Sequence, residues 1–155
     1  MLAADEALIF WRYIASSLDR LVGCLDGLSE AHLNWRPAAP DTNSLYALAT
    51  HTLGNAEENL LQTLLGQPVG RDRDGEFAAR GDSARAMAAR WSALRAEIGS
   101  RLAKLPADAL DAPYAHPRRG PLTGRELLLV VARHAAEHLG QAELTRDLLR
   151  ATPSD

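Results

Sequence analysis

The chain has 155 residues, 46% of them apolar and 24% charged, and a formal net charge of −3. These values are typical of a soluble globular protein, and the length suits a single domain, residues 1–155, with its own hydrophobic core. Lysine and arginine are spread along the chain, which argues against a nucleic-acid or membrane partner. The single cysteine, Cys24, excludes an intramolecular disulfide and a zinc site made of thiolates alone.

The N-terminal segment does not have the pattern of a secretory signal. It carries Asp5 and Glu6 where a signal peptide carries basic residues. No apolar run approaches the ~18 residues that a membrane span needs. We therefore expect a cytoplasmic protein, in which Cys24 is a partly buried small residue of the first helix.

The first predicted element is an amphipathic helix. Its apolar residues recur at spacings of three and four, which fits one face of a helix and not a strand. They are Ala4, Ala7, Trp11, Ile14, Leu18, Leu21, Leu25 and Leu28. A second helix is predicted to begin after Ser44, a suitable N-cap, and to end at Leu65, before Gly66.

A third helix is predicted to begin near Asp82 or Ser83 and to end before Pro106. The fourth opens with "TGRE", in which Thr123 and Glu126 have capping-box spacing, and it continues to about Arg150. No segment has the pattern of a strand. The sequence therefore predicts an all-α four-helix bundle. The link "GQPVGRDRDGEFAARG" between the second and third helices is long enough to cross the bundle.

His134 and His138 are placed on one face of the fourth helix. At 100° per residue both lie within about 20° of the direction of Leu127, which the pattern places toward the core. They are one turn apart, so both side chains can reach a single metal ion. One alternative is that each histidine lies in the core and hydrogen-bonds a polar neighbour. Another is that both lie at a solvent-exposed edge of the helix.

A third histidine strengthens the metal interpretation. His51 lies on a largely polar stripe of the second helix that also carries Asn55 and Glu58. Three neutral imidazoles suit zinc, nickel, copper or iron and leave one coordination position open, as in catalytic or substrate-binding sites. His32 and His116 are expected to be exposed in loops; the alternative is that one of them borders the site.

Three segments carry a family resemblance: "LNWRP", "SLYALATHTLGNAEENLL" and "ARHAAEHLGQAELTRDLLR". In their order and separation they resemble the DinB-like superfamily of metal-binding four-helix bundles, which includes thiol-dependent S-transferases and maleylpyruvate isomerase-like proteins. The resemblance implies that His51, His134 and His138 hold one divalent metal, zinc or nickel. It also implies a long crossover between the second and third helices, a homodimer, and a low-molecular-weight thiol as cofactor.

The function that the resemblance favours is a metal-dependent thiol S-transferase acting on a small molecule. Asn55, Glu58 and Gln141 are candidates for contacts to a ligand or to an imidazole. The other interpretation of these three is ordinary bundle polarity, which we favour for Glu58. No further catalytic residue is predicted. Two alternatives stay open: a non-catalytic metal-binding or dimeric interaction protein, and a metal-dependent hydrolase.

The loop "GRDRDGEF" offers a second set of candidates. Arg71 and Arg73 can grip a carboxylate of a cofactor or substrate, because guanidinium groups bind carboxylates in bidentate fashion. The more common outcome for such a charge run is a solvated loop, in which Asp72 and Asp74 neutralise the arginines. Phe77 is then a candidate for attaching the loop to the bundle.

Overall fold

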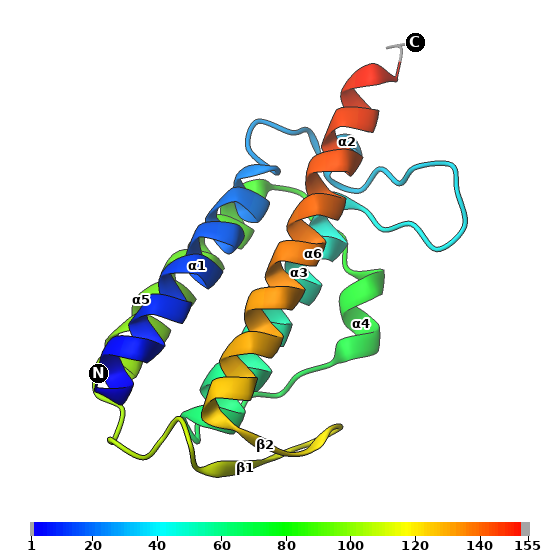
Figure 1. Cartoon of the computed structure of the whole chain (residues 1–155). Coiled ribbons are helices and arrows are strands. Elements are labelled where there is room, and N and C mark those ends of the chain that lie inside the picture. The colour runs from blue at the N-terminus through cyan, green and yellow to red at the C-terminus, as the bar shows by residue number, and fades with distance from the viewer. Residues whose placement is uncertain (1, 153–155) are drawn as a thin grey trace.

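The computed structural model describes residues 2–152 and consists mainly of helices (Figure 1). The all-α four-helix bundle is confirmed. Its long elements are α1 (Ala3–Gly23), α3 (Leu45–Ala56) continued by η1 (Glu57–Leu64), α5 (Ala84–Leu102) and α6 (Gly124–Ala151). Two short helices, α2 (Glu30–Leu33) and α4 (Arg73–Ala78), lie in the connections. No helix within residues 2–152 is both long and apolar enough to cross a membrane.

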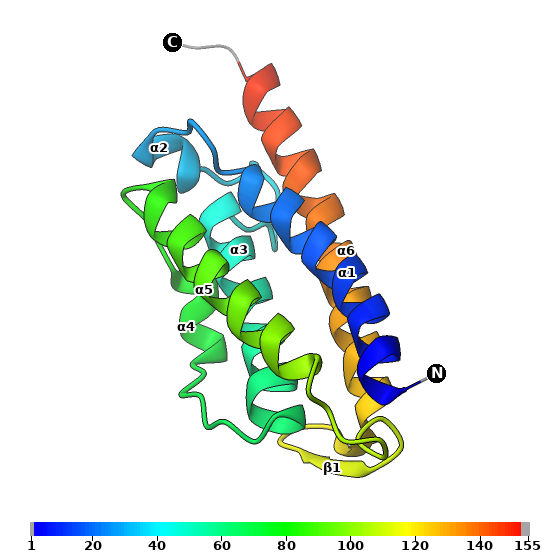
Figure 2. The same ribbon diagram turned by 90° about the vertical axis from the view of Figure 1, so that its left-hand side faces the viewer.

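The helices are arranged with a long crossover. α1 and α6 run in one direction, whereas α3 and α5 both run in the opposite one (Figures 1 and 2). The chain that leaves η1 must therefore return along the bundle before α5 begins, and α4 lies on this return path against α3. This confirms the predicted crossover. It also places a segment of the crossover beside the helix that carries His51.

The predicted apolar stripes of the first and third long helices form much of the core. Ile14 and Leu18 of α1 and Ile98 of α5 are fully buried. The rings of Trp11 and Trp91 join the same two helices, with centroids 5.9 Å apart. α1 ends at Gly23, earlier than the predicted stripe, and the chain turns beyond it with Gly27 at a φ of 72°.

Side-chain caps mark three helix starts as predicted. Ser44, Ser83 and Thr123 each accept a hydrogen bond from a backbone N–H in the first turn of the helix that follows. Thr123 and Glu126 form the complete capping box at the start of α6. The second long helix stops just before Gly66, whose φ of 69° is the left-handed conformation that commonly follows a helix.

The last part of the second long helix is a π-helix, η1, where the sequence predicts a continuous α-helix. In a π-helix each N–H bonds to the carbonyl five residues back, as Leu65 N does to Leu60 O at 2.9 Å just past the end of η1. Such segments are frequent at functional sites. η1 carries Glu58 in its first turn, about two turns beyond His51 of α3.

Two short strands correct the expectation that no segment forms a sheet. β1 (Pro113–His116) and β2 (Gly120–Thr123) pair in antiparallel fashion, from Pro113 with Thr123 to His116 with Gly120. Each strand has four residues, too few for a clear alternation of apolar and polar side chains to appear in the sequence. The hairpin lies at the end of the bundle where η1 ends and α6 begins (Figure 1).

Candidate metal centre

Three histidine side chains meet between α3 and α6. His134 and His138 come from successive turns of α6, and His51 reaches them from α3. The Nε2 atoms of His51 and His134 are 3.1 Å apart, and those of His134 and His138 are 3.2 Å apart. One nitrogen of each ring lies within 4.8 Å of the other two. The structure therefore contains a three-histidine group that can hold a metal ion.

Neighbouring side chains determine which ring nitrogens carry hydrogen. Nδ1 of His51 lies 2.9 Å from a carboxylate oxygen of Glu76, and Nδ1 of His138 lies 2.7 Å from the amide oxygen of Gln141. Both oxygens only accept hydrogen bonds, so each Nδ1 is the donor. The Nε2 atoms of His51 and His138 therefore offer lone pairs to the centre of the group.

The donor set fits a divalent cation. Zinc binds imidazole nitrogen at 2.0–2.1 Å, so the ligands of a tetrahedral ion stand about 3.3 Å apart. The two Nε2 separations, 3.1 and 3.2 Å, are close to this value. A neutral imidazole has a single N–H, so His134 cannot donate fully to the lone pairs of both neighbours. A cation shared by the three Nε2 atoms satisfies all of them.

The environment of the group keeps the imidazoles neutral. Burial, together with the nearby rings of His138 and His51, lowers the pKa of His134 to about 2. Burial also lowers the pKa of His138, against the opposing effect of its hydrogen bond to Gln141. Metal ions bind the neutral form of histidine, so these two rings do not have to lose a proton before they can act as ligands at neutral pH.

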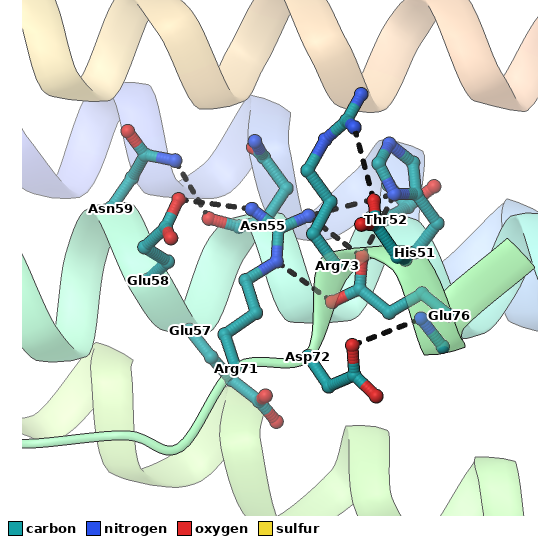
Figure 3. Close-up of polar contacts among 12 residues, drawn as sticks. His51, Thr52, Asn55, Glu57, Glu58, Asn59, Arg71, Asp72, Arg73 and Glu76 are labelled. Carbon is teal, nitrogen blue, oxygen red and sulfur yellow. Dashed lines mark hydrogen bonds and ion pairs between the residues drawn. The ribbon is translucent and has the colours of Figure 1, made fainter. Parts of the chain in front are cut away.

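Glu76 of α4 is a buried acidic residue that the sequence analysis did not single out. Its carboxylate accepts from Nδ1 of His51 and from Nε and Nη2 of Arg71, the latter at 2.7 and 2.8 Å (Figure 3). Burial raises the pKa of Glu76, but the hydrogen bonds from His51 and Arg71 outweigh it and the pKa is lowered. Glu76 is therefore ionised and fixes the orientation of the His51 ring.

Arg71 is buried, with a side chain 5% exposed, so the solvated-loop interpretation is wrong for this residue. Its guanidinium group lies between Glu76 and Glu58, and its Nη1 is 2.9 Å from Glu58 (Figure 3). The carboxylates that Arg71 grips are thus supplied by the chain itself. Arg73, the first residue of α4, has a half-exposed side chain, and its nearest carboxylate is Asp74 at 3.9 Å.

Glu58 is more than a polar residue on the bundle surface. Its side chain is 5% exposed and it binds Arg118 in bidentate fashion as well as Arg71. Burial raises the pKa of Glu58, but the contacts with Arg118 and Arg71 outweigh it and lower the pKa. Ordinary bundle polarity, the interpretation that we favoured, does not describe a buried carboxylate that joins two arginines from separate segments.

His116 corrects a second expectation. We expected it to be exposed in a loop, whereas it lies in β1 with a side chain only 1% exposed. Its Nδ1 accepts from the backbone N–H of Arg118 at 3.0 Å, so its hydrogen is on Nε2, which lies 4.0 Å from Glu58. Burial lowers the pKa of His116. The expectation of an exposed position holds for His32, and Cys24 is buried.

The remaining predicted site residues lie close to the group. Gln141 holds the His138 ring, as described above. Asn55 is one turn beyond His51 and 5% exposed, and its Oδ1 has no hydrogen-bond partner within residues 2–152. Phe77 of α4 packs against His51, with ring centroids 4.3 Å apart, so it does attach the crossover to the bundle.

Members of the histidine group line two pockets. One, of about 370 Å³, is lined by His51, Asn55, Arg71, Arg73, Arg118, Arg119 and His134. The other, also about 370 Å³, lies between the loop 37–43 and α6 and includes His138, Gln141 and the leucines Leu144 and Leu148. The first is rich in cations and the second has a larger apolar share.

Comparison with known proteins agrees with this architecture. The family model of the DinB superfamily matches residues 13–142, most of the chain. The chain belongs to the DinB superfamily. Among solved structures, a conserved protein from Enterococcus faecalis has a TM-score of 0.69 at 19% identity, covering 93% of this chain and 96% of that one. At this identity the likeness shows the fold alone. No curated protein matches the chain.

Three residues around the histidines of this DinB protein escaped the sequence analysis: Glu76, Arg118 and Arg119. One signal for Glu76 was present, because Gly54 interrupts a predicted helix, and an isolated glycine there often indicates a close approach. A Cβ at that position would collide with the Glu76 carboxylate. No comparable signal marks Arg118, which reaches Glu58 only because the hairpin folds beside η1.

Proposed function

We propose that this protein is a metal-dependent S-transferase that joins a low-molecular-weight thiol to a small electrophile. The observation that carries the proposal is that members of the three-histidine group line two pockets of different character. A thiol and an electrophile can approach such a group through separate pockets. Zinc and nickel both suit three imidazole ligands with one coordination position left open.

The chemistry needs little from the protein beyond positioning. A divalent metal with an open position lowers the pKa of a thiol that binds to it. The thiol sulfur forms a bond to a carbon of the electrophile, the bond from that carbon to its leaving group breaks, and the thiol proton passes to solvent. No oxidant or reductant is required. Glu76 and Gln141 hold two of the imidazoles, and Arg71 keeps Glu76 ionised and in place.

The carboxylates near the histidines favour thiol transfer over hydrolysis. A hydrolase that uses a bound water commonly has a carboxylate free to take its proton. In residues 2–152, Glu58 and Glu76 are both bound by arginine. Glu137 is half exposed and lies 4.0 Å from Arg133, as expected for a solvated side chain. A thiol, once ionised, needs no general base.

Metal analysis of the untagged protein is the first test. We expect about one equivalent of zinc or nickel in the wild type, measured by mass spectrometry, and its loss in His134→Ala. His32→Ala, which removes an exposed histidine, serves as the matched control and should keep the metal. Wild-type protein that refuses both added zinc and added nickel would contradict the metal site and the proposed activity with it.

The second test is conjugation. Metal-loaded protein is incubated with cysteine or glutathione and a halogenated bimane, and the fluorescent thioether is followed over time. We expect turnover that disappears in His134→Ala and survives in His32→Ala. Metal binding that raises the melting temperature without turnover for any thiol and electrophile tried would instead favour the alternative, a non-catalytic metal-binding protein.

A further inference from the structure

The pocket beside His51 and His134 is strongly cationic in a protein whose formal net charge is −3. Four arginines line it, two from the crossover and two from the tip of the β1–β2 hairpin: Arg71, Arg73, Arg118 and Arg119. Among residues 2–152, only two buried carboxylates, Glu58 and Glu76, pair with members of this set. The pocket therefore keeps an excess of positive charge.

The four arginines fall into two pairs with different roles. Arg71 is bound by Glu58 and Glu76, and Arg118 is bound by Glu58, so their donors are largely used within the protein. In the part of the chain that the structure describes, the one ion pair of Arg73 is with the exposed Asp74, at 3.9 Å. Within residues 2–152, Arg119 has no hydrogen bond or ion pair to another side chain. Arg73 and Arg119 thus have donors available to a ligand.

The fold holds both arginines at the pocket. The bidentate contact of Arg118 with Glu58 attaches the hairpin tip to η1, and Arg119 is the next residue. Arg73 lies over the ring of Phe77, with its guanidinium carbon 5.4 Å from the ring centroid. That ring packs in turn against His51. Two segments that are distant in sequence therefore each present one arginine with available donors to the same pocket.

Asn55 contributes a buried amide to the wall of the same pocket. Asn55 lines the pocket and is 95% buried, yet its Oδ1 has no hydrogen-bond partner within residues 2–152. Buried polar atoms are rarely left without a partner, because the cost of desolvating them is not recovered. Because this oxygen is itself buried, a ligand in the pocket does not reach it, and the guanidinium groups of Arg73 and Arg119 are the donors on which an anion site depends.

We propose that this pocket binds a small organic anion, with its carboxylate or phosphate group between Arg73 and Arg119 and the rest of the molecule directed toward His51 and His134. The inference rests on the proposed function and names the chemical class of one of its substrates. A volume of about 370 Å³ suits a small molecule. Guanidinium groups bind both kinds of oxyanion in bidentate fashion.

Binding of simple anions tests the proposal directly. Succinate, ethyl phosphate and the neutral succinamide are titrated at pH 8 and low salt, and affinity is measured by ligand-observed NMR, with metal-free and with zinc-loaded protein. The variant is Arg73→Gln/Arg119→Gln. The control, Arg12→Gln/Arg85→Gln, removes the same charge from exposed positions on α1 and α5. Melting temperature and metal content are recorded for each sample.

We expect succinate or ethyl phosphate to bind, and succinamide not to bind. The affinity should fall at least about tenfold in Arg73→Gln/Arg119→Gln and stay near the wild-type value in the control. Which anion binds better distinguishes a carboxylate ligand from a phosphate ligand. If neither anion binds, or if the variant and the control bind equally well, the proposal is overturned.

The metal-free samples separate this proposal from the proposed function. Arginine-dependent binding to protein that takes up no zinc would support the anion site and contradict the S-transferase. Zinc uptake without anion binding to the metal-free or the zinc-loaded protein would support the metal centre and contradict the anion site. Arginine-dependent binding with an unchanged melting temperature excludes a folding defect as the cause.

Discussion

At the scale of single residues, Gly54 shows how the crossover and the metal centre depend on one another. It lies in the interior of α3, where glycine destabilises a helix by about 1 kcal/mol relative to alanine. The Glu76 carboxylate occupies the space that a side chain would need. The absence of a side chain at Gly54 thus lets Glu76 approach His51. The glycine makes α3 less stable, but it makes room for the buried hydrogen bond between Glu76 and His51.

Replacing a glycine within a helix by alanine usually stabilises the protein, but at Gly54 we expect the replacement to destabilise it. We expect Gly54→Ala to lower the free energy of unfolding and weaken metal binding, because its Cβ displaces Glu76. Gly140→Ala is the matched control on α6, where a Cβ meets no atom within 4 Å. It should stabilise the protein by up to about 1 kcal/mol. Urea unfolding of both variants checks the pair, and equal stabilisation would contradict the account.

Glu76 is expected to affect the metal through His51. In Glu76→Gln the amide oxygen can still accept from His51, but the negative charge that also binds Arg71 is lost. Changes to such supporting residues typically reduce metal affinity by about 10–100-fold. Competition with a chromophoric chelator measures this affinity. Glu137→Gln, which alters a half-exposed glutamate beside His138, should leave the affinity unchanged; an equal loss in both variants would count against the role of Glu76.

At the scale of elements, the site depends on two segments outside the four long helices. α4 supplies Glu76 and Phe77, and the β1–β2 hairpin supplies His116 and leads to the arginines of its tip. Both segments are short, and neither has a hydrophobic period long enough to reveal it in the sequence. Their positions are set by contacts with α3 and η1 rather than by local propensity.

The capping box of α6 allows a test of pH dependence. Hydrogen bonds from the backbone and side chain of Thr123 lower the pKa of Glu126 in the folded protein. The ionised form therefore contributes stability above the unfolded pKa, about 4.3, and this contribution is lost as the pH falls through the lower folded value.

Glu126→Gln keeps an acceptor for the cap but removes the charge. We expect the variant to be less stable than the wild type at neutral pH, and the difference to shrink as the pH falls below the unfolded pKa of about 4.3 and through the lower folded value. Chemical unfolding at a series of pH values measures this difference. A gap that is constant from pH 7 to pH 3 would show that the charge contributes nothing.

At the scale of the whole molecule, a metal ion would join the two helices that carry the histidines, α3 and α6. An ion that binds only the folded state stabilises it by mass action, by about 2.7 kcal/mol at a free concentration one hundred times the dissociation constant. Zinc should therefore raise the melting temperature of the wild type and of His32→Ala, and not that of His134→Ala. Differential scanning calorimetry with and without zinc makes the comparison. Equal shifts in all three proteins would indicate binding elsewhere.

The distribution of charge in the folded molecule differs from its distribution along the sequence. Along the sequence the basic residues are scattered, and the two arginine pairs lie far apart, on the crossover and on the hairpin. In the folded chain they line one pocket beside His51 and His134. The net charge of the chain is negative, whereas the charge that lines this pocket is positive.

The homodimer stays a prediction, which analytical ultracentrifugation can test.

The sequence alone determined the long helices, several of their caps and the histidine pair of the fourth helix, because each of these depends on residues that are near one another along the chain. A stripe at three–four spacing, the box of Thr123 with Glu126 and the pair His134 and His138 are all local patterns. The crossover followed from the length of the link, and the assignment of His51 to the group followed from a family resemblance.

Only the tertiary structure decided what surrounds the histidines. Glu76, Arg118 and Arg119 reach the site from connections whose paths depend on packing across the bundle. Arg71 became a buried structural cation, and His116 a buried residue, for the same reason. A charged or polar side chain in a loop has no local pattern that distinguishes solvent from a buried partner. Its environment depends on where the chain brings an opposite charge or a hydrogen-bond partner.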